Sequence, residues 1–369
     1  MKKLHNLVIL GIETSCDDTG IAIIEANKRK PSPIKIWANF VSSQVKIHQK
    51  YGGVYPLLAK REHEKNLPIL FQKAKRKARS ASGRVKINLI AVTVGPGLEP
   101  CLWMGVNFAR NLAEELKVPL VPINHIEAHI YANFMATNSE QRTINNIFPA
   151  ISLIISGGHT QLILIKKFGK YQILGETRDD AAGECFDKIA RILGLGYPGG
   201  PAIEMEAAKF KIRNSKFKVD LPRPMIYQKN YDFSFSGLKT AALYHHRKQT
   251  TRTKKSKKYI RAVAAETQQA VIDVLIKKTI KAAQQYKVKT IILGGGVSAN
   301  KELRKQFKTQ IKKELPYTKY KAPDIKYSTD NALMVAVTAY YKWLKDKKKT
   351  VRDWKKIKPN ANLRVENEI

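Results

Sequence analysis

The sequence has little cysteine, little acidic charge and no long apolar run. Its three cysteines, Cys16, Cys101 and Cys185, are widely separated, which excludes a disulfide framework and a thiol-based metal site. No apolar stretch approaches the roughly 20 residues that a helix needs to span a bilayer. The apolar start of the chain soon meets Glu13 and has no small-residue cleavage site, so it does not fit a signal peptide. We therefore expect a cytoplasmic protein that contacts no membrane.

Acidic residues are scarce relative to basic ones. The 369 residues carry 67 Lys and Arg against 30 Asp and Glu, which gives a formal charge of +37 and a pI near 10.0. Such a field attracts polyanions in a salt-dependent way, and nucleic acid is a reasonable partner. A lysine-rich proteome would produce the same excess, so charge alone does not identify that partner. The cations cluster at residues 73–79, 247–258, 277–289 and 342–358, of which we predict 247–258 to be an exposed loop.

Strands and helices alternate along the chain, which indicates an α/β protein. Each half opens with an apolar strand, a small polar or glycine-rich turn and a second apolar strand, a repetition that we interpret as a weak internal duplication. The expected strands are 6–13, 19–25, 88–94, 118–122, 150–155, 161–166 and 290–293. The expected helices are 102–116, one from 125, one ending near 193, one from 301 and one at 332–344.

The length of the chain and this repetition predict two lobes. We place the N-terminal lobe at 1–130 and complete it with the helix at about 332–345. The C-terminal lobe covers 148–331, after a polar linker at 137–146. The last residues, 346–369, are expected to form a basic tail.

Two histidines four residues apart, His125 and His129, are the most informative local feature. On a helix this spacing puts both imidazoles on one face, within reach of one transition-metal ion. Zinc peptidases of the H-E-x-x-H type have their Glu directly after the first His, whereas Glu127 comes second and would point away from a bound metal. The pair therefore suggests a metal and argues against a metallopeptidase, although two helix-surface histidines would have the same spacing. Asp330 is either the N-cap of the helix at 332–344 or an oxygen ligand that completes the site.

Polar or glycine-rich turns follow several of the expected strands. Those at 17–20 and 156–158 can direct backbone N–H groups at a phosphate, although each would also serve as an ordinary hairpin turn. The turn at 294–300 joins a strand to a helix and suits the sugar or phosphate of a nucleotide. Residues 194–201 are too rich in Gly and Pro for a helix, and we expect them to wrap a ligand or a domain junction.

Ten motifs occur along the chain in a fixed order. They are GIETSCDDT at 11–19, GPGL at 95–98, HxxxH at 125–129, SGGHT at 156–160, DDAAGE at 179–184, FDK at 186–188, YPGGP at 197–201, FSFSGLKT at 233–240, GGGVSAN at 294–300 and DN at 330–331. Together they resemble the universal tRNA N6-adenosine threonylcarbamoyltransferase family over roughly residues 7–340.

This resemblance implies a fold and two binding sites. The fold would be the duplicated α/β fold of actin, sugar kinases and heat-shock-chaperone ATPases, with two lobes around a central cleft. One divalent metal, Fe²⁺ or else Zn²⁺, would be held by His125, His129 and Asp330. Contacts to ATP, AMP or threonylcarbamoyl-AMP would map to Ile154, Ile155, Ser156, Gly157, Gly158, Asp187, Gly200, Glu204 and Asn300.

The resemblance also implies a reaction. Threonylcarbamoyl-AMP would transfer its threonylcarbamoyl group to N6 of the adenosine 3′-adjacent to the anticodon, in tRNAs that read codons beginning with A. AMP would leave, with the metal acting as a Lewis acid. No Ser-His-Asp or Cys-His pair is required, because the substrate arrives activated and positioning can do the rest. His159 is an accessory candidate that would orient a phosphate or pass a proton, or else make a structural hydrogen bond.

Partners and alternative functions follow from the same comparison of motifs. The segment at 156–160 resembles the bacterial branch, whose members work with a degenerate paralogue of the same fold and a small ATPase. The segment at 97–102 instead resembles the archaeal and eukaryotic branch, whose complex contains an atypical kinase. A kinase or another carbamoyltransferase of the same fold, a chaperone-like ATPase and, less favoured, a metallopeptidase are the alternatives.

Overall fold

A computed structural model of the chain describes residues 6–27, 34–83, 85–135, 146–210, 217–351 and 353–367. Of the expected linker at 137–146, all but Asn146 lies outside these residues. None of the described helices combines the length and apolarity that crossing a bilayer requires.

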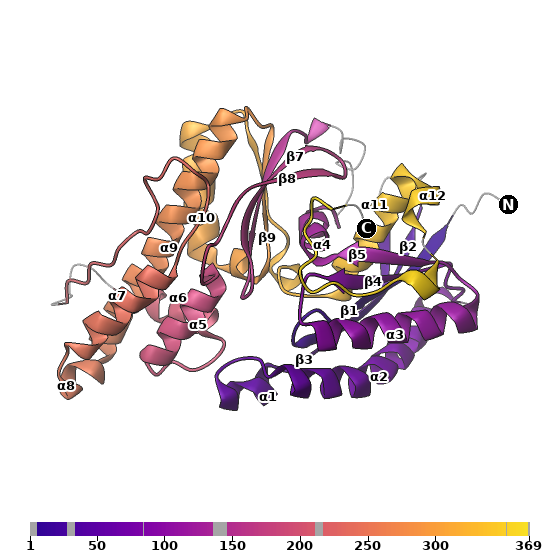
Figure 1. Cartoon of the computed structure of the whole chain (residues 1–369), viewed down its shortest axis with the longest axis horizontal. Coiled ribbons are helices and arrows are strands. Elements are labelled where there is room, and N and C mark those ends of the chain that lie inside the picture. Colours follow the sequence, from indigo (N-terminus) through magenta and orange to yellow (C-terminus); the bar gives the residue numbers. More distant parts are fainter. Residues whose placement is uncertain are drawn as a thin grey trace. The chain divides into compact units, whose positions relative to one another are not determined.

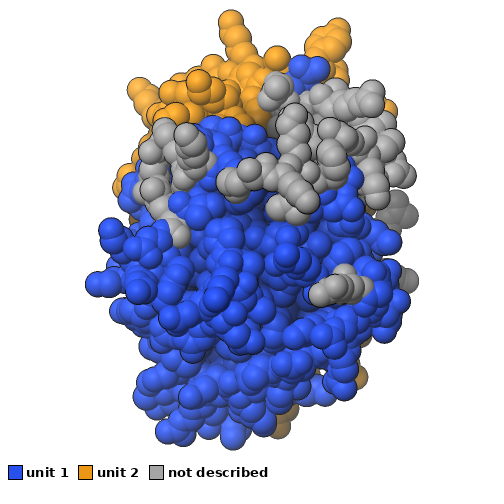
Figure 2. All heavy atoms as spheres, turned by 90° about the vertical axis from the view of Figure 1, so that its right-hand side faces the viewer, with its two compact units in different colours: residues 1–146, 323–369 blue, residues 147–322 orange. Residues whose placement is uncertain are grey.

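The chain forms two compact units. Unit 1 contains Met1–Asn146 and Pro323–Ile369, and unit 2 contains Ile147–Ala322; Figure 2 colours them blue and orange. We expected the second lobe to continue to residue 331 and residues 346–369 to form a basic tail. Residues from Pro323 onward belong instead to unit 1, so Asp330 shares a unit with both histidines.

Unit 1 consists of one five-stranded sheet with its helices. The strands are β1 (Leu7–Glu13), β2 (Asp18–Ala26), β3 (Ile34–Ser43), β4 (Leu89–Gly95) and β5 (Leu120–Asn124). The α-helices are α1 (Val45–His48), α2 (Pro56–Ser82), α3 (Glu99–Leu116), α4 (His125–Tyr131), α11 (Ala332–Lys345) and α12 (Lys347–Thr350). The short 3₁₀ helices are η1 (Gln49–Tyr51), η2 (Ala132–Phe134), η6 (Ile325–Tyr327) and η7 (Trp354–Lys356).

Strands β1, β4 and β5 in the sheet of unit 1 are buried on both faces. Its strand order is β3-β2-β1-β4-β5, with β4 and β5 parallel to β1 and the other pairs antiparallel. Leu10 and Ile12 of β1 share one apolar core with α2 and α3. Gly11 faces the other side, where a Cβ atom would lie 2.3 Å from the backbone oxygen of Ala332 in α11. Helices on both faces explain why β1, β4 and β5 are buried along their whole length and are largely apolar.

Unit 2 has a second five-stranded sheet. Its strands are β6 (Ala150–Ile155), β7 (Thr160–Lys167), β8 (Lys170–Glu176), β9 (Thr290–Gly294) and β10 (Lys319–Lys321). Its helices are α5 (Ala182–Ile192), α6 (Gly199–Ala208), α7 (Ser236–Arg247), α8 (Thr251–Lys254), α9 (Lys257–Gln285), η5 (Gly296–Ala299) and α10 (Lys301–Glu314).

The two sheets have the same connectivity. Figure 1 labels β1 to β5 of the first sheet and β7, β8 and β9 of the second. From the antiparallel edge, unit 2 runs β8-β7-β6-β9-β10 where unit 1 runs β3-β2-β1-β4-β5. In both sheets an opening hairpin is followed by two strands parallel to the first. The duplicated α/β fold is therefore confirmed, and every expected strand is present with its ends shifted by at most two residues.

Two segments that we expected to be irregular contain helices. Residues 247–258 are not a loop, because they include the end of α7, all of α8 and the start of α9. Lys and Arg favour helices, and the Thr250 hydroxyl caps α8 by accepting from the backbone N–H of Thr253. Within 194–201, α6 begins at Gly199. The ring of Pro201 fixes its φ near the helical value, so a proline is compatible with the first turn of a helix.

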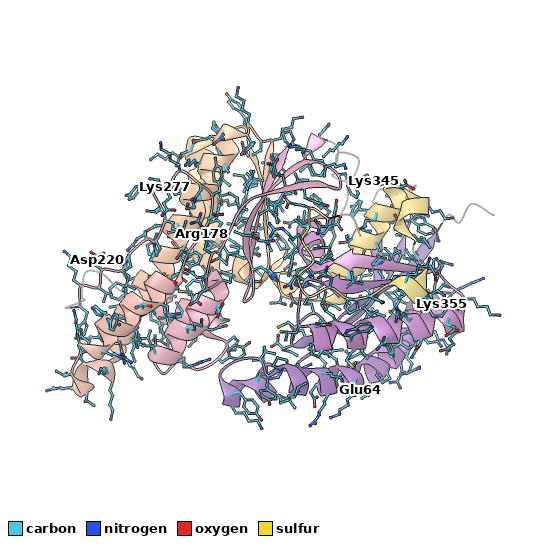
Figure 3. The ribbon with its side chains drawn as sticks, in the orientation of Figure 1. Glu64, Arg178, Asp220, Lys277, Lys345 and Lys355 are labelled. Carbon is cyan, nitrogen blue, oxygen red and sulfur yellow. The ribbon has the colours of Figure 1, made fainter. Side chains whose placement is uncertain are left out.

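The C-terminal segment, residues 353–367, packs on unit 1. The Arg110 guanidinium of α3 donates to the backbone oxygens of Trp354 (3.1 Å) and Lys355 (2.8 Å), the latter residue labelled in Figure 3. The backbone N–H of Asn360 donates to Val94 O at 2.7 Å. A Cβ atom on Gly95, whose φ is +149°, would come within 1.9 Å of Asn360 O. The segment therefore packs against the end of β4, and only glycine fits at position 95.

Candidate metal centre and nucleotide-binding turns

Helix α4 positions the two histidines. Strand β5 ends at Asn124, whose side-chain oxygen accepts from the backbone N–H groups of Ile126 (2.8 Å) and Glu127 (3.2 Å). This cap starts the helix at His125 and places His129 one turn later on the same face. The two ring centroids are 4.6 Å apart, and both residues are buried.

Asp330 completes the group. Its Oδ1 lies 3.1 Å from His129 Nε2 and 3.5 Å from His125 Nε2. Two atoms bound tetrahedrally at about 2.0–2.1 Å from one ion are about 3.3 Å apart, so the donor set fits a metal such as iron or zinc. The alternative role of Asp330 as an N-cap is wrong, because the neighbouring Asn331 caps α11 by accepting from the backbone N–H of Met334. These three residues can hold a metal ion.

A fully buried carboxylate, Glu13, supports this group from the end of β1. Its Oε1 accepts from the backbone N–H of Ser15, and its Oε2 accepts from the Thr93 hydroxyl, both at 2.6 Å. The same Oε2 is 3.2 Å from His125 Nδ1. A carboxylate at Nδ1 keeps the ring proton there and leaves the Nε2 lone pair free for a metal. Glu13 was not among the predicted site residues, although an acidic residue that closes an apolar strand is a usable signal.

The electrostatics of the centre favour a cation. Burial alone would lower the pKa of His125, but the charges of Asp330 and Glu13 raise it to about 9. Burial alone would raise the pKa of Glu13, but the adjacent His125 holds it below its usual value. In the β1–β2 turn, burial and the charge of Asp330 raise the pKa of Asp17, and they raise that of Asp18 to about 7. A bound divalent ion would relieve the repulsion among these carboxylates.

Glu127 takes no part in the metal-ligand group that the described residues form. Its carboxylate pairs with the ammonium group of Lys342 on α11 at 3.2 Å. The carboxylate that a zinc peptidase would place beside its metal is thus engaged elsewhere, as the spacing predicted.

In unit 2, Ile154 and Ile155 are the last residues of the buried strand β6. The turn that follows, between β6 and β7, has exposed backbone. The backbone N–H of Ser156 donates to His159 O at 2.8 Å, and the His159 N–H donates to the Ser156 hydroxyl at 3.0 Å. Gly157 and Gly158 are exposed, and a Cβ added to either would meet no atom within 4 Å. The turn is therefore closed on itself, with its two glycines open to a ligand.

Two neighbouring elements pack against this turn. The N–H of Gly183 in α5 donates to Ser156 O at 3.2 Å. At the end of β9, Gly295 lies so close to β6 that a Cβ atom would be 2.4 Å from Ile155 O. The starts of α5 and of the β9–α10 turn thus meet at the carboxyl ends of β6 and β9. In doubly wound sheets this is the edge at which ligands bind.

The remaining predicted nucleotide contacts connect the same elements. Asp187 of α5 accepts from the Gly199 N–H at 2.6 Å, beside the open Gly200. Glu204 of α6 accepts from the Lys301 N–H at 2.8 Å. Asn300 caps α10 and donates to Gln268 of α9 at 2.8 Å. All nine predicted residues therefore lie on elements that contact one another within unit 2.

Comparison with known proteins gives matches over most of this chain. The profile of the tRNA N6-adenosine threonylcarbamoyltransferase family matches residues 35–337. A protein of that name from Syntrophomonas wolfei is 46% identical over 92% of this chain and 94% of its own length. Another from Thermosipho africanus is 45% identical over 90% of this chain and 94% of its own.

Solved structures show the same fold at much lower identity. HypF of T. kodakarensis superposes with a TM-score of 0.59 and 15% identity, over 93% of this chain and 48% of HypF. This chain thus spans about half of HypF, and the likeness concerns the fold alone. The family match and the close relatives, by contrast, extend over most of the sequence. The chain therefore belongs to the tRNA N6-adenosine threonylcarbamoyltransferase family.

Proposed function

We propose that this enzyme transfers the threonylcarbamoyl group of threonylcarbamoyl-AMP to N6 of the adenosine 3′-adjacent to the anticodon in tRNAs that read codons beginning with A. The observation that carries the proposal is the His125–His129–Asp330 group in a chain 46% identical to a relative of that activity. In this reaction the amine nitrogen forms a bond to the carbamoyl carbon. The bond from that carbon to the AMP phosphate oxygen breaks, and the amine loses one proton.

The two units have different tasks in this proposal. The N–H groups around Ser156, Gly157 and Gly158 bind phosphate oxygens of the adenylate, while Glu204 and Asn300 bind its sugar. Glu13 keeps the proton of His125 at Nδ1. When bound, Fe²⁺ or Zn²⁺ supplies a Lewis acid for the carbamoyl or phosphate oxygens.

The proposed partners follow from the substrate and from the bacterial-type motif at 156–160. We place the enzyme in the cytoplasm with tRNA, a degenerate paralogue of the same fold and a small ATPase. His159, which closes the β6–β7 turn through its backbone, orients a phosphate or accepts the proton released by the amine.

The direct test is reconstitution. The purified metal-loaded chain, with its candidate partner proteins, is incubated with threonylcarbamoyl-AMP and a tRNA transcript, and the nucleosides are analysed by mass spectrometry. We expect threonylcarbamoyladenosine only when enzyme and tRNA are both present. Phosphorylation of a small molecule without modified adenosine would favour a kinase of the same fold instead.

A substitution at Gly158 tests the nucleotide-binding turn separately. In Gly158→Val the new side chain has space in the folded protein but fills the surface where a phosphate would approach. We expect an unchanged melting temperature and a KM for threonylcarbamoyl-AMP raised at least about tenfold, which corresponds to about 1.4 kcal/mol.

Gly183→Ala is the contrasting variant for this test. Its Cβ would lie 2.5 Å from Ser156 O, so it should lower both the melting temperature and substrate binding. An unchanged KM in a correctly folded Gly158→Val variant would remove this turn from the substrate site.

A further inference from the structure

One end of unit 2 carries an unusual concentration of positive charge. We call residues 245–261 the basic tip; it comprises the end of α7, all of α8 and the start of α9, and Figure 1 shows α8 at one extremity of this helical pair. The tip contains eight Lys and Arg and no Asp or Glu. Six of these cations are exposed: Arg247, Lys248, Arg252, Lys255, Lys257 and Lys258.

These exposed cations are not neutralised within the described part of the chain, where no carboxylate pairs with any of the six. Pairing resumes directly beyond them, since Arg261 binds Glu206 at 3.2 Å. Elsewhere in unit 2, Lys188 pairs with Asp180 at 2.6 Å. The tip is therefore a local surplus of charge, and mutual repulsion among its cations would be relieved by a bound polyanion.

The tip is also held in a fixed shape. Tyr259 is fully buried at its centre, and its hydroxyl lies 3.1 Å from His245 Nδ1. The two rings stack with centroids 5.8 Å apart and an interplanar angle of 7°. Gln249 donates to His245 O at 3.2 Å, which closes the turn after α7. A surface whose backbone is already ordered loses less entropy when it binds a partner.

Helix α9 adds to the positive field and connects the tip to the candidate nucleotide turns. Its first turn contains Lys257 and Lys258 but no acidic residue, so these charges add to the positive end of the helix dipole. Eleven residues further along, or about 16 Å along the helix axis, Gln268 accepts from the Asn300 side chain. Helix α9 thus runs from the tip to a contact with Asn300, one of the candidate adenylate contacts.

We propose that the basic tip binds the sugar-phosphate backbone of the substrate tRNA, outside the adenosine that is modified. This inference rests on the proposed function for the identity of the RNA. Phosphate contacts fix the register of a nucleic acid without reading its sequence. An anionic membrane fits less well, because residues 245–261 expose no large apolar side chain that could insert into it.

The test compares two variants of the full metal-loaded chain that lose the same charge. The tip variant combines Arg252→Gln, Lys255→Gln, Lys257→Gln and Lys258→Gln. The control combines Lys305→Gln, Lys308→Gln, Lys312→Gln and Lys313→Gln, all exposed on α10 of the same unit. The dissociation constant for tRNA is measured over a series of salt concentrations.

We expect the tip variant to bind tRNA at least about tenfold more weakly at 0.15 M salt. The negative slope of log K, the logarithm of the association constant, against log salt concentration should become shallower by about 3. The control should change the affinity less than about threefold. Equal losses in both variants would show an effect of net charge and overturn the proposal, as would unchanged affinity in the tip variant. Loss of binding only to phosphatidylglycerol vesicles would also overturn it.

Kinetics separate this proposal from the proposed reaction. For the tip variant we expect a raised KM for tRNA with kcat unchanged at saturation. If tRNA binding falls but no preparation modifies adenosine, the tip is supported and the reaction is wrong. If adenosine is modified with an unchanged KM for tRNA, the reaction is supported and the tip is wrong.

Discussion

Replacing His129 by alanine is expected to empty the metal centre and to reduce adenosine modification about 10³-fold. The residue is almost fully buried, and its Nε2 lies 3.1 Å from Asp330 Oδ1. Without it, His125 and Asp330 provide only two ligands, too few to hold iron or zinc tightly. A Lewis acid stabilises developing charge by several kcal/mol, and about 4 kcal/mol corresponds to about 10³ in rate. Metal analysis and tRNA modification are measured on the same samples.

Glu127→Gln is the matched control for this experiment. It changes a carboxylate two residues before His129 that pairs with Lys342 rather than with the metal-ligand group. We expect it to retain about one metal ion per chain and near wild-type modification. Full activity from metal-free His129→Ala would remove the histidines from the reaction. If Glu127→Gln retains its metal but loses activity, the Glu127 carboxylate has a catalytic role beside the metal, as in a zinc peptidase, which contradicts our interpretation.

Replacing Glu13 by glutamine should weaken metal binding about 10- to 100-fold while leaving the unit folded. The carboxylate accepts from Ser15, Thr93 and the His125 ring through two oxygens. An amide of the same size has one acceptor oxygen, so its NH₂ group must face a donor. The imidazole then loses its charged partner at Nδ1 and keeps only the neutral Ser15 hydroxyl, which is 3.2 Å from the same nitrogen. Competition with a chromophoric chelator measures the affinity, and circular dichroism checks the fold.

Thr93 supplies the control for Glu13. Thr93→Ser keeps the hydroxyl that donates to Glu13 at 2.6 Å and should bind metal like the wild type. Thr93→Val removes that donor, and its metal affinity should lie between those of Thr93→Ser and Glu13→Gln. A Glu13→Gln variant with wild-type metal affinity and lost activity would mean that Glu13 acts on the substrate rather than through His125.

Local sequence patterns predicted the parts of the centre that lie close together in the chain. The spacing of His125 and His129 is a property of one helix turn, so it could be interpreted without a structure. Asp330 is 201 residues from His129, and its sequence context allowed both a cap and a ligand. Glu13 is 112 residues from His125 and was missed, because nothing near either residue indicates that β1 and α4 meet.

The errors in secondary structure also arise from contacts that the local sequence does not reveal. The lysine-rich segment at 247–258 lacks apolar periodicity, so its helices could not be predicted from pattern alone. They depend on Tyr259, which is buried against residues of α7. The seven strands that we predicted are mostly apolar runs with buried side chains. Strands β3, β8 and β10 have exposed and polar residues and were missed. Tertiary contacts thus decided the elements for which the local pattern was weak.

The division of unit 1 into two stretches of sequence affects how the protein is made. A ribosome releases both histidines about 200 residues before Asp330, an interval of about 10–40 s at 5–20 residues per second. During this interval all of unit 2, one uninterrupted stretch, emerges and can fold. Unit 2 can therefore be complete in a nascent or prematurely terminated chain before the three candidate metal ligands are together, so this group can form only at the last stage of biosynthesis.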